Sequence, residues 1–114
     1  MPERRKLKRR HLIYYLRVFD VASNQLFGHL VDITTEGIML ISEDHKDVNK
    51  VFELKMVLPS EIGGKKEFHF DSKSVYSKKD INPDFYDTGF LLINVDQEDL
   101  NMIDKLITRF GFRD

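Results

Sequence analysis

The apolar residues of this 114-residue chain fall into short runs separated by polar, glycine- or proline-containing breaks. In the run that starts at Phe52, apolar side chains at every second position alternate with Glu53 and Lys55, and Pro59 ends the run. A period of two is typical of a strand with one buried face. The runs predict six β-strands, at residues 11–20, 26–31, 37–41, 52–58, 66–77 and 86–94.

The fifth of these strands contains a change of parity. Phe68 and Phe70 share one parity, whereas Val75 has the other. A continuous strand can place all three on one face only if it holds an extra residue, so we predict a β-bulge within residues 66–77.

After the sixth strand the hydrophobic period changes from two to between three and four. Asp96 is a good N-cap, Asp99 follows three residues later, and Gly111 can stop a helix. The pattern predicts one C-terminal helix with an apolar stripe formed by Leu100, Ile103, Leu106, Ile107 and Phe110.

Six strands and one helix without an internal linker indicate a single domain that is either a β-sandwich or a small β-barrel, with the helix against an apolar face or mouth. A barrel has no unpaired strand edges, but periodicity alone does not separate the two architectures.

The composition excludes several classes of protein. The chain has no cysteine, which excludes disulfides, cysteine-ligated zinc and thiol catalysis. The longest apolar segments, such as residues 12–16 and 89–95, are far shorter than the roughly 20 residues of a membrane helix. We see no secretory leader, and expect a cytoplasmic protein without membrane insertion.

Charge is distributed unevenly along the chain. Residues 1–10 hold six cations and one anion, whereas residues 11–114 hold twelve cations and eighteen anions, so a basic arm of about +5 precedes a body of about −6. Within the arm, Arg5 and Arg9 lie four positions apart. A guanidinium group can form paired hydrogen bonds with a phosphate and stack on a base, although a basic end can also be merely solvated.

A second polar element, residues 32–37, separates two apolar runs. The Asp32 carboxylate can accept hydrogen bonds from the adjacent donors of a guanine edge, and the Thr34 hydroxyl can assist. Gly37 allows unusual backbone torsions or a close approach. Taken alone, such a turn is more often a simple strand connection.

The two elements together resemble the PilZ domain, a bacterial receptor for cyclic di-GMP. That family carries an RxxxR stretch, matched here by Arg5 and Arg9, and a later (D/N)xSxxG turn, matched by Asp32, Thr34 and Gly37. The segments 74–76 and 88–90 and the closing helix are also similar, so the resemblance covers nearly the whole chain.

The resemblance implies a six-stranded antiparallel β-barrel with a C-terminal α-helix at residues 11–114, preceded by a flexible basic arm at residues 1–10. It also implies that the arm folds over cyclic di-GMP, signalling to a downstream partner protein. The implied ligand-binding residues are Arg5, Arg9, Asp32, Thr34 and Gly37, with auxiliary contacts from Arg4, Lys6, Arg10 and Tyr76.

One position departs from the family pattern, because Thr34 replaces its serine. The hydroxyl is kept, but the extra methyl group restricts the side chain. Two alternatives therefore stay open: an adaptor that does not bind the nucleotide, and a nucleic-acid-binding protein that uses the basic arm. The acidic body argues against the second.

Catalysis is not indicated by any motif. The four histidines show no metal-ligand spacing, and the chain has no nucleophile elbow, phosphate-binding glycine loop or HExxH motif. We expect neither an enzyme nor a metal site, and no cofactor apart from the ligand.

Overall fold

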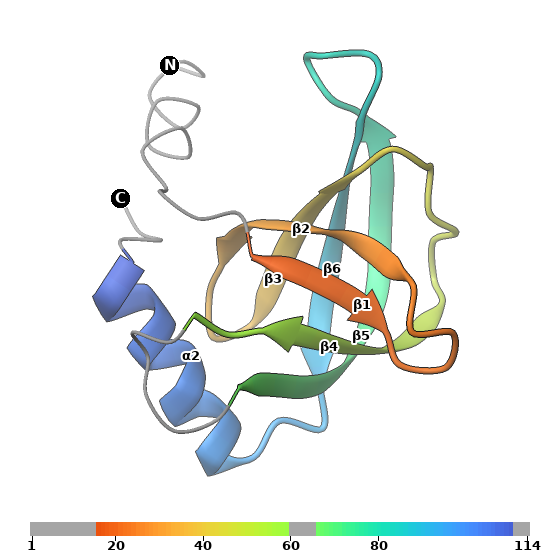
Figure 1. Ribbon diagram of the computed structural model, residues 1–114. Coiled ribbons are helices and arrows are strands. Elements are labelled where there is room, and N and C mark those ends of the chain that lie inside the picture. Colours follow the sequence, from red (N-terminus) through yellow and green to blue (C-terminus); the bar gives the residue numbers. More distant parts are fainter. Residues whose placement is uncertain (1–15, 60–65, 111–114) are drawn as a thin grey trace.

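The computed structural model describes residues 16–59 and 66–110, with residue 110 described by its backbone only. These residues form a β-barrel with one helix beside it (Figure 1). In chain order the elements are β1 (Arg17–Asp20), β2 (Leu26–Ile33), β3 (Gly37–Ser42), β4 (Val51–Val57), β5 (Glu67–Lys79), β6 (Tyr86–Ile93) and α2 (Gln97–Phe110).

The six strands close into a barrel in the order β1-β2-β3-β6-β5-β4, and every neighbouring pair is antiparallel. Closure occurs where β4 pairs with β1, with Val18 opposite Met56. This confirms the barrel that the resemblance implied and decides against the sandwich. The predicted strand residues 11–15 and the predicted turn at Gly63 and Gly64 lie outside the described residues.

The predicted bulge in the fifth strand is confirmed. Along β5, the pairing with β4 is regular, but the register against β6 shifts between Ser74 and Tyr76. Val75 is the extra residue. Val75 is 43% exposed. The change of parity therefore predicted the bulge, but Val75 does not share the buried face of Phe68 and Phe70. The bulge turns Tyr76 to a new position opposite Gly89.

One hydrophobic core fills the barrel. Alternate residues of β4 and β5 point inward, and the Phe68 and Phe70 rings lie 5.3 Å apart between their centroids. The core cluster comprises Leu16, Val18, Leu30, Ile33, Ile38, Leu40, Leu54, Met56, Leu58, Phe68, Phe70, Phe90, Ile103 and Leu106.

Helix α2 covers one end of the barrel. The Asp99 N–H donates to Asp96 Oδ1 (2.9 Å) and the Asp96 N–H donates to Asp99 Oδ2 (3.2 Å), so the predicted N-cap is confirmed as a reciprocal capping arrangement. Ile103 and Leu106 are fully buried in the common core. The Phe110 side chain and Gly111 lie outside the described residues.

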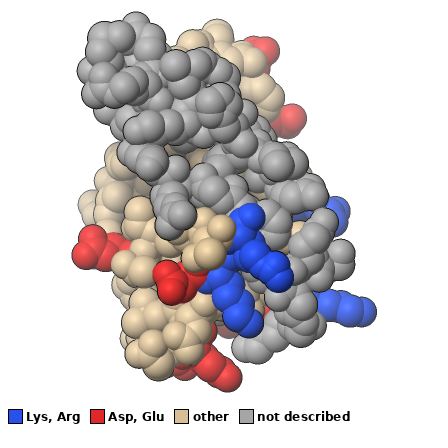
Figure 2. All heavy atoms as spheres, turned by 90° about the vertical axis from the view of Figure 1, so that its left-hand side faces the viewer, with Lys and Arg blue, Asp and Glu red and all other residues tan. Residues whose placement is uncertain are grey.

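The charges of α2 also fit its position. Acidic Glu98 and Asp99 occupy the first turn and Arg109 the last, which complements the helix dipole. On the side of the molecule that carries α2, a group of basic side chains lies near the centre of the view, with acidic side chains to its left and below it and further basic side chains at the right edge (Figure 2). No helix within residues 16–59 and 66–110 is long and apolar enough to cross a membrane.

Candidate functional site

The predicted recognition turn connects β2 to β3. The Thr34 N–H donates to the Gly37 carbonyl oxygen at 2.8 Å. Thr34 Oγ1 accepts the N–H groups of Glu36 and Gly37, each at 3.2 Å. Thr34 Oγ1 therefore holds the turn together, in addition to the ligand contact that the resemblance implied for it.

Gly37 is required at the end of this turn by a close approach between strands. A Cβ added to Gly37 would lie 2.5 Å from the carbonyl oxygen of Phe90, in the neighbouring strand β6. Of the two roles that the sequence allowed for Gly37, the structure supports close packing of backbone on backbone. The Asp32 carboxylate lies beside it on β2, where its Oδ1 accepts the Ile33 N–H at 2.9 Å.

Beside the turn, the outer surface of the barrel is hollowed into an open cleft of about 240 Å3. Four residues that the sequence singled out meet there: Asp32, Thr34, Gly37 and Tyr76. They come from strands β2, β3 and β5 and from the turn between β2 and β3, and they are up to 44 positions apart in the chain. The full lining is Asp32, Ile33, Thr34, Gly37, Ile38, Met39, Val75, Tyr76, Gly89 and Phe90.

Tyr76 forms one wall of the cleft by lying across Gly89. A Cβ on Gly89 would lie 2.3 Å from Tyr76 Cε2, so the ring occupies the space that any other residue at position 89 would fill. The Tyr76 hydroxyl donates to Met39 Sδ at 3.4 Å. Lys78 Nζ lies 5.6 Å from the ring centroid, and Tyr76 is 41% exposed. The site thus presents an accessible aromatic surface next to a carboxylate.

The sequence analysis did not predict that Tyr76 packs against Gly89, or that Met39 contributes to the site. A signal existed for Gly89, because glycine inside a strand often marks a bulge or a close approach. For Met39 the alternation of β3 gives no such signal, since its half-buried side chain reaches Tyr76 only through the bulged pairing of β5 with β6.

The arginines of the predicted clamp, Arg5 and Arg9, lie outside the described residues, as do Arg4, Lys6 and Arg10. The described chain starts beside the site, because the Leu30 N–H donates to the Leu16 carbonyl oxygen at 2.8 Å. Arg9 precedes Leu16 by seven positions, a span of at most about 25 Å. Leu30 precedes Asp32 by two residues, or about 7 Å along the strand. Covalent geometry therefore permits the arm to reach the cleft.

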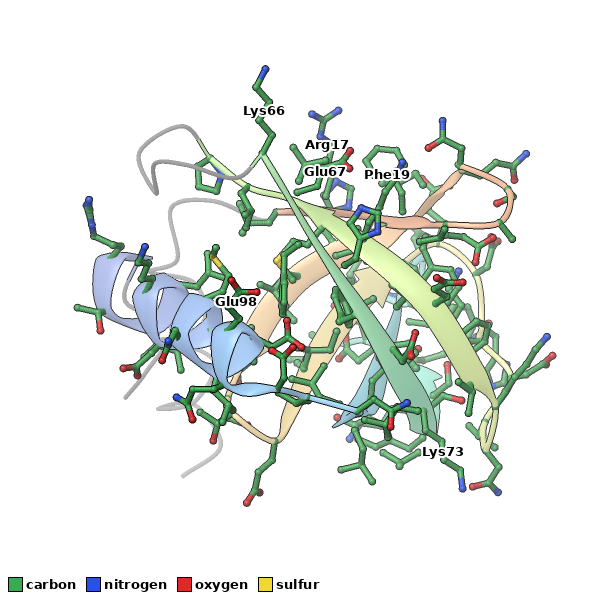
Figure 3. All side chains as sticks on the ribbon, turned by 90° about the horizontal axis from the view of Figure 1, so that it is seen from below. Arg17, Phe19, Lys66, Glu67, Lys73 and Glu98 are labelled. Atoms are coloured by element: carbon green, nitrogen blue, oxygen red, sulfur yellow. The ribbon has the colours of Figure 1, made fainter. Side chains whose placement is uncertain are left out.

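The face formed by β1, β4 and β5 offers a different surface. Arg17, Phe19 and Glu67 lie there (Figure 3), and Glu67 contacts both Lys55 (3.9 Å) and His69 (3.2 Å). An ion pair near the surface, such as that of Lys55 with Glu67, contributes roughly 0 to 1 kcal/mol. Within residues 16–59 and 66–110 no group of three or more His, Asp or Glu side chains could hold a metal ion.

Comparison with known proteins found similar structures but no similar sequences. No protein-family model matches the chain, and no curated protein matches it by sequence. The PilZ domain of YcgR from Escherichia coli, solved with c-di-GMP, superposes with a TM-score of 0.66 and 16% identity over 85% of this chain and 81% of that one.

Two further structures show the same likeness. The Bacillus subtilis inhibitor of motility MotI/DgrA has a TM-score of 0.68 and 12% identity over 88% of this chain. The apo form of MrkH from K. pneumonia has a TM-score of 0.68 and 12% identity over 86% of this chain. The matches span only 49% and 47% of those two chains. At these identities the likeness concerns the fold, and by its fold the chain is a PilZ-like domain.

Proposed function

We propose that this chain is a binding module for cyclic di-GMP, in which the basic arm and the β2–β3 turn hold the ligand between them. The observation that carries the proposal is the cleft where Asp32, Thr34, Gly37 and Tyr76 meet, although they come from separate parts of the sequence. The fold adds support, because the E. coli PilZ domain with this fold was solved with c-di-GMP.

Each part of the site has a chemical role in this proposal. The Asp32 carboxylate accepts hydrogen bonds from the ring N–H and exocyclic amine of a guanine. Gly37 has no side chain to project into the cleft, and the Tyr76 ring offers a face for stacking on a base. Arg5 and Arg9 bind phosphate groups and guanine faces, with Arg4, Lys6 and Arg10 as auxiliary phosphate contacts.

The size of the cleft supports a role for the arm in binding. Its volume of about 240 Å3 is below the range of roughly 300–1,000 Å3 for pockets that enclose whole ligands. The cleft formed by the described residues can therefore hold only part of a dinucleotide. In this proposal the arm covers the other side of the ligand. Ordering of the arm on the ligand would create a new surface for a downstream partner protein. We propose that this receptor has no catalytic role and works in the bacterial cytoplasm.

The direct test is calorimetric titration of the full chain with cyclic di-GMP, with the variants Arg5→Ala and Arg9→Ala. A hydrogen bond to a charged group contributes about 1.5–3 kcal/mol, so each variant should bind roughly tenfold to a hundredfold more weakly. Lys105→Ala, on the exposed face of α2, is the matched control for loss of one cation and should bind like the unaltered chain. Unaltered affinity in both arginine variants would remove the arm from the site.

The same titration separates the two alternatives. A nucleic-acid-binding protein would bind a DNA duplex as well as it binds the dinucleotide, and its affinity would fall steeply with added salt. An adaptor that has lost its ligand would show no heat of binding with cyclic di-GMP at any concentration tested.

A further inference from the structure

A second hollowed region lies at the end of the barrel away from α2 (Figure 1), where β2 and β4 begin and β3 ends. We call this region the mouth. It contains two clefts, of about 400 and 190 Å3, which share Leu26, Phe27, Asp44 and Lys46. None of the residues that line the mouth lines the cleft beside the recognition turn. The mouth is therefore a separate feature of the molecule.

Two cations lie over two aromatic rings in the mouth. The Phe27 and Phe52 rings are 4.9 Å apart between centroids. Lys46 Nζ lies 4.0 Å from the centroid of Phe27, and Lys50 Nζ lies 5.3 Å from that of Phe52. Both lysines line the larger cleft, so two amino groups face one open space.

The loop that carries these lysines is fastened to the barrel. The Lys46 N–H donates to Ser77 Oγ at 3.1 Å, and Ser77 Oγ lies 2.9 Å from Thr88 Oγ1. Ser74 Oγ donates to the Asp47 carbonyl oxygen at 2.6 Å and accepts the Lys50 N–H at 3.2 Å. Because the backbone is held at both ends of residues 46–50, the fold sets the positions from which the two lysine side chains extend.

The two lysines differ in their surroundings. Lys50 has a side chain that is 57% exposed, and its Nζ lies 4.0 Å from Asp47 Oδ2. Lys46 is half-buried, and among the described residues no carboxylate lies within 4.0 Å of its Nζ. Burial lowers the pKa of Lys46, and this effect outweighs Asp44 and Asp20, which raise it. A lowered pKa favours the neutral amine of Lys46, which is its nucleophilic form, and the exposed Lys50 is placed to contact an anion in the same cleft.

We propose that Lys46 is a modification site that accepts an acyl group from an acyl phosphate, with Lys50 holding the phosphate of the donor in the same cleft. The Lys46 ammonium first loses a proton to water. Its Nζ then attacks the carbonyl carbon, so that an N–C bond forms and the C–O bond to phosphate breaks. Inorganic phosphate leaves with the electron pair, and the nitrogen loses a second proton to water to give a neutral amide.

This modification would change the mouth in a defined way. The amide no longer carries the positive charge that faces the Phe27 ring, so the cation–π contact is lost. Asp20 and Asp44 remain in the larger cleft, which changes from two cations and two anions to one cation and two anions. The modification is a charge switch that does not depend on the proposed nucleotide site.

The experiment is to incubate the folded full chain with acetyl phosphate at pH 8 and to measure acetylation at each lysine by peptide mass spectrometry. We expect Lys46 to react at least about fivefold faster than Lys105, which is exposed on α2, because its amine is the better activated nucleophile. In urea-unfolded chain the two rates should become similar. Equal rates at Lys46 and Lys105 in the folded chain would overturn the proposal.

A second reagent isolates the role of Lys50. Lys50→Gln should slow acetylation of Lys46 by acetyl phosphate several-fold, but leave its acetylation by N-hydroxysuccinimidyl acetate, which has no phosphate, unchanged. If Lys50→Gln slows both reagents equally, Lys50 supports the loop and does not hold the donor, and the two-lysine site is wrong.

Discussion

The recognition cleft and the mouth are two hollows of one barrel that are built in opposite ways. The cleft is built on two glycines that let other groups pack closely, because the Phe90 carbonyl oxygen lies against Gly37 and the Tyr76 ring lies against Gly89. The mouth is filled by the rings of Phe27 and Phe52, with lysine amino groups above them. Phe90 lines the cleft and connects it to the mouth, because its carbonyl oxygen lies under Gly37 while its ring lies 5.9 Å from that of Phe27 and 6.0 Å from that of Phe52.

This difference indicates which substitutions should change the stability of the fold without changing ligand binding. Truncating a side chain in the mouth removes packing and leaves the backbone of the cleft in place. Adding a single methyl group at Gly37 pushes against the Phe90 backbone and displaces the strand that carries the recognition turn. Substitutions in the mouth should therefore lower mainly the free energy of unfolding, whereas this substitution in the cleft should lower both the free energy of unfolding and the affinity.

The largest effect on stability is expected for Phe90→Ala. Phe90 is 2% exposed, and its ring packs against the rings of Phe27 and Phe52. Truncation of this side chain should therefore lower the free energy of unfolding by about 3–5 kcal/mol. Urea unfolding monitored by circular dichroism measures this loss. Below the unfolding transition, affinity for cyclic di-GMP should change less than about threefold, since the carbonyl at position 90 is kept. An unaltered unfolding midpoint, or loss of binding in a folded variant, would contradict the view that this substitution affects stability and not ligand binding.

The next effect is expected for Gly37→Ala, which tests the cleft. The new Cβ would lie 2.5 Å from the Phe90 carbonyl oxygen, and β3 and β6 must separate locally to admit it. Overpacking of this kind costs about 1–3 kcal/mol. We also expect affinity for cyclic di-GMP to fall by more than about tenfold, because the displaced strand carries the recognition turn.

Gly89→Ala is the matched control for this substitution. Its Cβ would meet the Tyr76 ring, a side chain that can swing away, so the loss of stability should be smaller than for Gly37→Ala. A loss for Gly89→Ala equal to or larger than that for Gly37→Ala would mean that the Tyr76 ring is as immobile as the backbone.

Much of the fold follows from local sequence patterns. The alternation from Phe52 to Leu58 predicts β4, the parity change at Val75 predicts the bulge, and Asp96 with Asp99 predicts the helix start; the structure confirms all three. These features depend on neighbours within a few residues. The closed strand order does not, because a period of two records which face is buried and not which strand lies alongside. Only the resemblance to a known family predicted closure.

The two sites could likewise be predicted only where they depend on local sequence. The motif pattern picked out Asp32, Thr34 and Gly37, but the contact of Tyr76 with Gly89 depends on the register between β5 and β6, which the bulge sets. The mouth was not predicted at all. Phe27, Phe52 and Lys46 lie in separate segments, and only the closed barrel with its fastened loop places one amine over one ring.

The smallest effect is expected at Thr34, and it refines the description of the cleft. Thr34→Val keeps the shape of the side chain but removes the oxygen that accepts the N–H groups of Glu36 and Gly37. Water can replace these bonds because the turn is exposed, so the loss in unfolding free energy should be only about 0.5–1 kcal/mol. Thr34→Ser keeps the oxygen and should change stability by less than about 0.5 kcal/mol. If the hydroxyl also contacts the ligand, Thr34→Val should weaken cyclic di-GMP binding several-fold in calorimetry, whereas Thr34→Ser should bind at least as tightly as the unaltered chain, because it has no methyl group beside the base. Equal affinities for all three chains would restrict Thr34 to shaping the turn and leave base recognition to Asp32.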